Sequence, residues 1–164
     1  MFTRSFAEIG EPFEAVEVAL LQAPEIWLPD ATTPKARLGL GSGEIKVHVG
    51  AAGLTKNVRI AFGPPQRNAT KTSIPVSWRA TGLSWLFPQL DGVLEVSRSD
   101  SMRTLLALLV EYRPPLGLLG EILDEALLHR IAWATVSIFR DTVAQTLEEL
   151  AQRDCSPSRV EAEP

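Results

Sequence analysis

The side chains best suited to acid–base chemistry gather between residues 111 and 130. Tyr112 is the only tyrosine and His129 is one of two histidines, so the pair could supply a proton donor and a proton acceptor. Charged side chains accompany them, namely Glu111, Arg113, Asp124, Glu125 and Arg130. We favour structural anchoring over chemistry for this cluster, and we keep Tyr112 and His129 as the catalytic candidates.

Motifs of the common hydrolases and phosphate-binding enzymes are missing from the sequence. No Gly-x-Ser-x-Gly nucleophile elbow occurs. The glycines of Gly39–Gly43 precede a strand pattern rather than a helix, and no Lys-Ser/Thr pair follows them, so they predict a turn and not a phosphate site. There is no third histidine and no spaced set of carboxylates or thiolates. We therefore expect neither a metal nor a cofactor.

Composition narrows the class of protein further. The chain has 164 residues, of which 45% are hydrophobic and 22% charged, and its formal net charge is −4. This acidic balance, without clustered Lys or Arg, argues against nucleic-acid binding. One cysteine excludes an internal disulfide, and no apolar stretch approaches the ~20 residues that span a bilayer. The first residues lack the hydrophobic core of a signal peptide, so we expect a cytoplasmic protein without membrane insertion.

The chain opens with a strand pattern and two helix patterns. Phe2–Ile9 is a candidate first strand that Gly10 ends. Pro12 suits the first turn of a helix, and apolar residues then follow helical spacing to Leu21. A second, short helix is predicted over Pro24–Leu28.

Alternating apolar and polar residues predict an antiparallel sheet across the middle of the chain. Pro75 lies inside one of these runs and fits an edge or a bulge, because it cannot donate to a strand ladder. The final run is apolar on both parities, so its outer side chains are either covered or meet a partner. The predicted strands are Lys35–Leu40, Glu44–Val49, Lys56–Phe62, Thr72–Ala80, Gly92–Ser97 and Met102–Tyr112.

A single long helix is predicted from Leu118 to Ala151, with a length of about 45–50 Å. One helix cannot cover a flat sheet of this width, so the sheet must curl around it and leave a cavity between them. We expect one domain over residues 1–151 and a disordered polar tail over residues 152–164, which contain two prolines.

This order of elements resembles the helix-grip fold of the START-like (SRPBCC) superfamily. Glu11–Pro29, with its Pro-x-x-Trp segment, resembles the opening of that superfamily. Tyr112–Gly120 resembles the entry into the terminal helix of its polyketide cyclase/dehydrase-like bacterial members. The resemblance covers residues 1–150 and implies an α+β fold. In that fold a curled antiparallel sheet of about seven strands surrounds a long C-terminal helix, with two short helices after the first strand.

The resemblance also implies a cavity for a lipid, a sterol, a polyketide or another apolar molecule, without implying catalysis. Large apolar side chains should line it, with Trp85 and Phe87 near its mouth. The expected lining residues are Phe62, Trp78, Trp85, Phe87, Leu108, Val110, Tyr112, Ile131 and Trp133.

The sequence is compatible with three functions. The first is binding of an apolar small molecule. The second is a cyclase/dehydratase-type enzyme that uses Tyr112 and His129. The third is an interaction module, for example a homodimer, that uses the outer apolar parity of the last strand, namely Leu105, Ala107 and Leu109.

Overall fold

The computed structural model describes residues 2–28, 41–49, 54–80, 89–113 and 125–155. Seven strands form one antiparallel sheet in the order β1-β7-β6-β5-β3-β2, and β4 pairs with β5 beside that path. The α+β fold and the strand count expected from the sequence are thereby confirmed. The strands are β1 (Phe2–Ile9), β2 (Gly41–Val49), β3 (Leu54–Phe62), β4 (Gln66–Asn68), β5 (Lys71–Ala80), β6 (Gln89–Arg98) and β7 (Thr104–Arg113).

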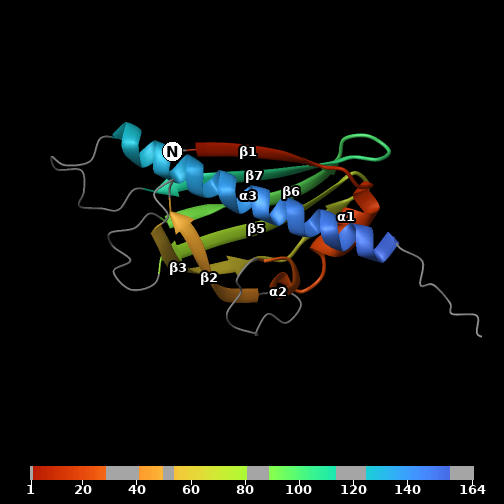
Figure 1. Ribbon diagram of the computed structural model, residues 1–164, viewed down its shortest axis with the longest axis horizontal. Helices are drawn as coiled ribbons and strands as arrows, with labels where there is room; N and C mark the ends of the chain where they lie inside the picture. Colours follow the sequence, from red (N-terminus) through yellow and green to blue (C-terminus); the bar gives the residue numbers. More distant parts are fainter. Residues whose placement is uncertain (1, 29–40, 50–53, 81–88, 114–124, 156–164) are drawn as a thin grey trace, which may run out of the picture.

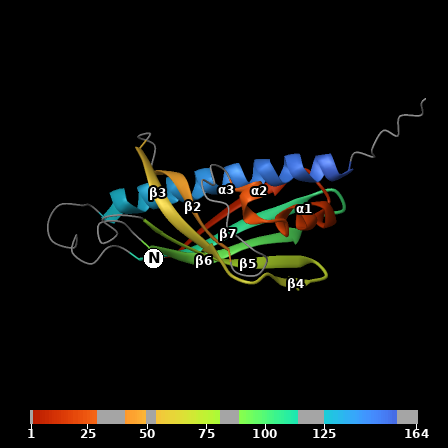
Figure 2. The ribbon, with the colours of Figure 1, turned by 90° about the horizontal axis from the view of Figure 1, so that it is seen from below.

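Three helices complete the described chain: α1 (Phe13–Leu20), α2 (Pro24–Trp27) and α3 (Glu125–Cys155). Pro12 precedes α1 and Pro24 opens α2, as the sequence predicts. Figure 1 shows α3 lying diagonally across one face of the sheet, with α1 beside its C-terminal half. Figure 2 shows β2 and β3 rising from the sheet beside the same helix.

The sheet curls around α3 without closing into a barrel. The edge strands β1 and β2 do not pair with each other. Both nevertheless contact α3, which also contacts β7, α1 and α2. The helix therefore bridges the two edges, as the sequence argument requires.

Alternation along the strands decides which side chains α3 covers. On β5, Thr72, Ile74, Val76 and Trp78 are buried, whereas the residues between them are only partly buried. The register aligns these positions with inward residues of β6 and β7. One apolar core results, and it includes Phe139, Val143 and Leu147 of α3.

Gly92 lies in the middle of this inner face, where β6 and β7 approach each other closely. A Cβ atom built there would lie 2.2 Å from the backbone oxygen of Leu109 and 2.7 Å from Val110 Cγ1. No side chain fits at that distance, so the position requires glycine.

Pro75 occupies a break in the ladder, in agreement with its expected place. Although β5 is a central strand, β3 pairs with it only from Val76 onward and β4 pairs with it only up to Ser73. Pro75 lies between these two pairings, and its carbonyl accepts a hydrogen bond of 2.8 Å from the Gly63 N–H. A proline is tolerated there because no neighbour needs its missing donor.

Some expected boundaries differ from the structure. The last helix continues to Cys155, beyond the expected end at Ala151, because no proline or glycine stops it there. Strand β4 was not expected, since its three residues are all exposed and carry no alternation. The expected strand Lys35–Leu40, the start of the helix at Leu118 and residues 156–164 of the tail lie outside the described residues.

Candidate functional site

The candidate site is the inner face of the sheet beneath α3, where two aromatic pairs connect the sheet to the helices. The rings of Trp78 and Phe139 meet edge to face, with centroids 5.1 Å apart and planes at 89°. Trp27 of α2 meets Phe62 of β3 in the same way, at 5.2 Å and 70°. These contacts link α2 and α3 to the sheet through large apolar side chains.

Trp78 lies near the end of the sheet at which α3 begins. The register aligns it with Ile60 on β3 and with Leu90 on β6. Close by, β5 ends at Ala80, which pairs with Val58 in the middle of β3, and β6 begins at Gln89, which pairs with the end of β7 (Figure 1). Several strands and one long helix thus converge on a surface made of apolar side chains.

Four of the expected lining residues lie on this inner face. Phe62, Trp78, Leu108 and Val110 are buried members of the core that α3 covers. The structure therefore brings these four together, while their contact with a ligand stays a prediction.

Other expected residues are placed only by their backbone. Tyr112 pairs with Leu90, which pairs in turn with Trp78. His129 and Ile131 lie in the first turns of α3. Trp85 and Phe87 lie outside the described residues, so their place at a mouth stays a prediction.

Trp133 differs from the buried residues because 54% of it is exposed. It lies four residues before Ser137 and seven before Arg140, so helical spacing puts it on the α3 stripe that faces β1. One turn later this stripe is covered by the sheet. Trp133 therefore lies at the margin of the face of α3 that the sheet covers. Its place in a cavity wall stays a prediction.

A polar seam joins α3 to β1, and the sequence analysis missed it. Arg140 donates from Nη1 to the Ser5 hydroxyl at 2.8 Å and to the Phe6 carbonyl at 2.7 Å. Further along the seam, the Gly10 N–H donates to Glu148 Oε1 at 3.3 Å. Thr3 and Ser5, which alternate with exposed residues on β1, were the signal that could have revealed inward hydroxyl groups.

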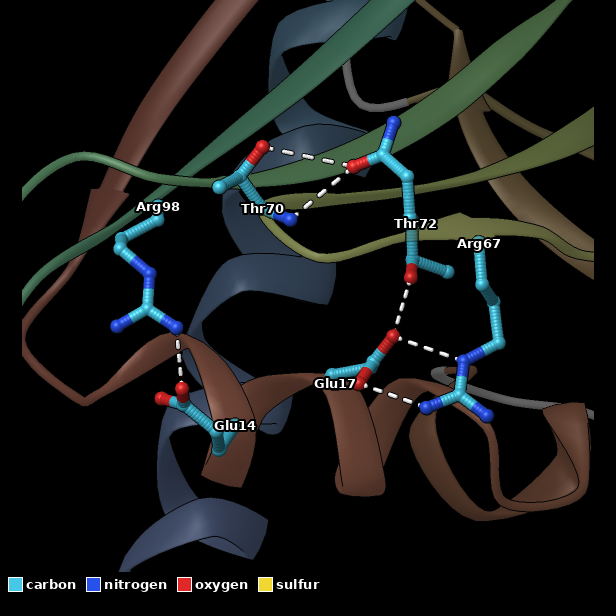
Figure 3. Close-up of polar contacts among 7 residues, drawn as sticks. Glu14, Glu17, Arg67, Thr70, Thr72 and Arg98 are labelled. Atoms are coloured by element: carbon cyan, nitrogen blue, oxygen red, sulfur yellow. Dashed lines mark hydrogen bonds and ion pairs between the residues drawn. The ribbon is translucent and has the colours of Figure 1, made fainter.

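A second polar group pins α1 to the inner face of the sheet, beside α3 (Figure 3). Arg67 donates to both carboxylate oxygens of Glu17 at 2.9 Å, and the Thr72 hydroxyl donates to the same carboxylate. Arg67 lowers the pKa of Glu17, burial opposes that change, and Thr72 adds to the lowering. Nearby, Arg98 pairs with Glu14. All of these groups have partners, so the arrangement is structural.

The described residues contain no group of three or more His, Cys, Asp or Glu side chains that could hold a metal ion. Among the helices in the described ranges, none is long and apolar enough to cross a membrane.

No protein-family model matches the sequence, and no curated protein matches it. Solved structures match over nearly the whole chain. A conserved protein from Geobacillus kaustophilus superposes with a TM-score of 0.65 at 9% identity, covering 94% of this chain and 97% of its own. The Zhui aromatase/cyclase from Streptomyces sp. R1128 gives 0.63 at 15% identity, with 97% and 98% covered.

A START superfamily protein from Mycobacterium smegmatis gives a TM-score of 0.59 at 13% identity, covering 93% of this chain and 97% of its own. At such identities a likeness shows the fold and no shared activity. The curled sheet, the two short helices and the bridging α3 have the order and arrangement of the helix-grip fold. The chain therefore has the START-like, helix-grip fold.

Proposed function

We propose that the protein binds an apolar small molecule between α3 and the inner face of its sheet. The observation that supports this most is the path of the helix. Among the described residues, the α3 backbone approaches β1, β2 and β7 closely but approaches the central strands β5 and β6 less. The space over the central strands is spanned by large side chains such as Trp78 and Phe139. A helix held away from a curled sheet is an arrangement that can admit a ligand.

The chemistry of the central strands favours an apolar ligand. Their inward residues carry no charge, and the apolar side chains among them are buried: Ile74, Val76, Trp78, Leu90, Leu94 and Val96. A charged ligand placed against these side chains would lose its hydration without gaining an ion-pair partner. A lipid, a sterol or a polyketide-like aromatic molecule would instead gain from burial of its apolar surface.

The test is a binding titration with two matched variants. Palmitate, cholesterol and 1,8-dihydroxyanthraquinone serve as probes, with quenching of tryptophan fluorescence and native mass spectrometry as readouts. Val110→Phe adds a ring on the inner face, whereas Leu109→Phe adds the same kind of ring one residue away on the outer face. We expect Val110→Phe to fold and to lose binding, and Leu109→Phe to bind like the wild type.

Two results would contradict the proposal. The first is that none of the three probes binds to the wild type. The second is that Val110→Phe unfolds the protein, because a closely packed core without space tolerates no added ring.

A cyclase/dehydratase-type enzyme is the second candidate. The register supports it by aligning Tyr112 with Leu90 and Trp78, at the end of the sheet where His129 follows in α3. Two structural neighbours, at 15% and 13% identity, are an aromatase/cyclase and a di-domain ARO/CYC. Tyr112→Phe and His129→Ala should then abolish turnover of a poly-β-ketone substrate and preserve its binding. Unchanged turnover in both variants would remove these residues from any mechanism.

A further inference from the structure

Two buried hydroxyl groups at the seam between α3 and β1 have no hydrogen-bond partner. Thr3 is 6% exposed and Ser137 is 8% exposed. Within the described part of the chain, Thr3 Oγ1 and Ser137 Oγ are the buried side-chain oxygens that no donor or acceptor satisfies. Folded proteins rarely leave buried polar atoms unpaired, so each such atom needs an explanation.

The hydrogen bonds of the seam place these two residues opposite each other. The contacts from Arg140 to Ser5 and from Glu148 to Gly10 show that α3 and β1 run in the same direction. Ser137 precedes Arg140 by about one helical turn. Thr3 precedes Ser5 by two residues and shares its inward parity. Thr3 and Ser137 therefore lie beside each other in the seam, about one helical turn nearer the start of α3 than the contact between Arg140 and Ser5.

This step borders the apolar face described above. Thr3 pairs with Val110, and Val110 pairs with Gly92 on β6. One turn before Ser137, α3 carries the exposed Trp133. The two hydroxyl groups thus lie between an aromatic side chain at the margin and the buried apolar surface of the sheet.

We infer that Thr3 and Ser137 form a polar subsite that binds a neutral hydroxyl or carbonyl group of the apolar ligand. This inference rests on the proposed function and specifies the polar end of the molecule. A hydroxyl group can donate and accept, so the two side chains suit either oxygen group. A carboxylate is disfavoured, because the nearest seam cation, Arg140, already bonds Ser5, Phe6 and Asp141.

The experiment compares two probes that differ by one hydroxyl group, naphthalene and 2-naphthol. Equilibrium dialysis gives the Kd of each probe for the wild type and for the double variant Thr3→Val/Ser137→Ala. We expect the ratio of the two Kd values to shift by about tenfold against 2-naphthol in the double variant, because one or two hydrogen bonds are lost. The Kd for naphthalene should stay within about twofold of the wild-type value, since the variant removes no apolar contact.

Thr104→Val is the matched control. It removes another buried hydroxyl from the inner face, but one that donates to the Glu11 carbonyl at 2.8 Å, at the other end of β7. We expect this variant to keep the wild-type ratio of Kd values. The single variant Ser137→Ala should shift the ratio in the same direction as the double variant, by less.

The thermal midpoint without ligand gives a second readout. Removing unpaired buried hydroxyls should leave the midpoint of the double variant equal to or above that of the wild type. A lower midpoint would show that the hydroxyls have partners in the free protein and would overturn the inference. An unchanged ratio of Kd values would overturn it while leaving the proposed function intact, whereas a wild type that binds neither probe would contradict both.

Discussion

Arg67 donates two hydrogen bonds to the carboxylate of Glu17, from Nε and from Nη2, each 2.9 Å long. The pair joins β4 to α1 across 50 positions of sequence. Helix α1 has only 8 residues, and a helix of that length is not stable by itself in water. The ion pair therefore helps to hold α1 against the sheet, and through α1 it supports one end of α3.

This pair predicts a loss of stability in acid. The pKa of Glu17 lies below its ordinary value of 4.5, so the folded state favours the charged carboxylate. The contribution is present above pH 4.5 and is lost as the pH falls through the lowered pKa of the folded state. Glu17→Gln should lower the free energy of unfolding at pH 7 by about 1 kcal/mol, because the amide keeps an acceptor but loses the charge. Urea unfolding measured from pH 7 to pH 3 should show that the free energy of unfolding falls less steeply for this variant than for the wild type.

The control for that experiment is Glu8→Gln. Glu8 is an exposed residue whose carboxylate lies 3.7 Å from Arg103, a distance and setting in which an ion pair contributes little. Its pH profile should match that of the wild type. A profile of Glu17→Gln that also matches the wild type would show that the Arg67 pair contributes nothing to stability.

The edge-to-face contact between Trp78 and Phe139 predicts a large effect of truncation. Phe139→Ala should lower the free energy of unfolding by about 3–5 kcal/mol, because it opens a cavity over the central strands. The adjacent residue Ile138 is 40% exposed, so Ile138→Ala should change stability by less than about 1 kcal/mol. Urea denaturation followed by circular dichroism measures both. Equal effects at the two positions would contradict the packing described here.

Local patterns in the sequence reveal some features of this fold and hide others. Alternation predicted β5 and β6 because each has one buried and one wetter face, and prolines predicted the starts of α1 and α2. Periodicity did not reveal β4, which buries nothing. It also hid Glu17, which follows Phe13 by four residues and therefore shares its buried face, a signal that a glutamate there needs a partner. Its partners, Arg67 and Thr72, come from distant strands that only the folded chain brings near.

In the candidate site, too, local patterns predicted some features, whereas contacts between distant residues were missed. The inward position of Phe62, Trp78, Leu108 and Val110 was predicted because strand parity decides which residues are buried, while their contact with a ligand stays a prediction. The seam between α3 and β1 was missed because its contacts, such as Arg140 to Ser5, join positions 135 residues apart. Likewise, the carboxylate of Glu148 accepts a hydrogen bond from the Gly10 N–H, 138 positions earlier in the sequence. Pairings of this kind depend on how the helix lies on the sheet, and no local pattern encodes that.

We expect position 92 to tolerate no residue other than glycine without loss of stability. Gly92→Ala places a Cβ atom 2.2 Å from the Leu109 oxygen, so the two strands must separate. We expect a loss of about 3 kcal/mol in the free energy of unfolding. Gly63→Ala is the comparison, since its Cβ atom would meet the Pro75 side chain at 3.0 Å and requires a smaller shift. Thermal unfolding should rank Gly92→Ala clearly below Gly63→Ala, and the reverse order would contradict the close approach of β6 and β7.

The outer face of β1 and β7 is the place where a homodimer would form, and that association stays a prediction. Phe2 and Phe6 are half exposed there, and the register aligns Phe6 with Ala107. If this face joins two copies, Phe6→Ser should weaken the dimer at least tenfold in sedimentation equilibrium, because burial of the ring is lost. Met102→Ser, which changes a still more exposed apolar residue outside the strands, should leave the dimer unchanged. A strictly monomeric wild type at high concentration would contradict the prediction.

We expect Arg140 to protect the free edge of β1 from pairing with a strand of another chain. Its Nη1 donates to the Phe6 carbonyl, and the carboxylate of Glu148 accepts from the Gly10 N–H. Two side chains of α3 thus satisfy backbone groups that could otherwise pair with another strand. Arg140→Met should lower the free energy of unfolding by about 1–3 kcal/mol, because the buried Ser5 hydroxyl loses its donor. It should also produce concentration-dependent aggregates in sedimentation velocity, since the edge becomes open to pairing between chains. Arg153→Met, at a position whose side chain is 74% exposed, should do neither, and an Arg140→Met protein as stable and as dispersed as that control would show that the edge needs no guard.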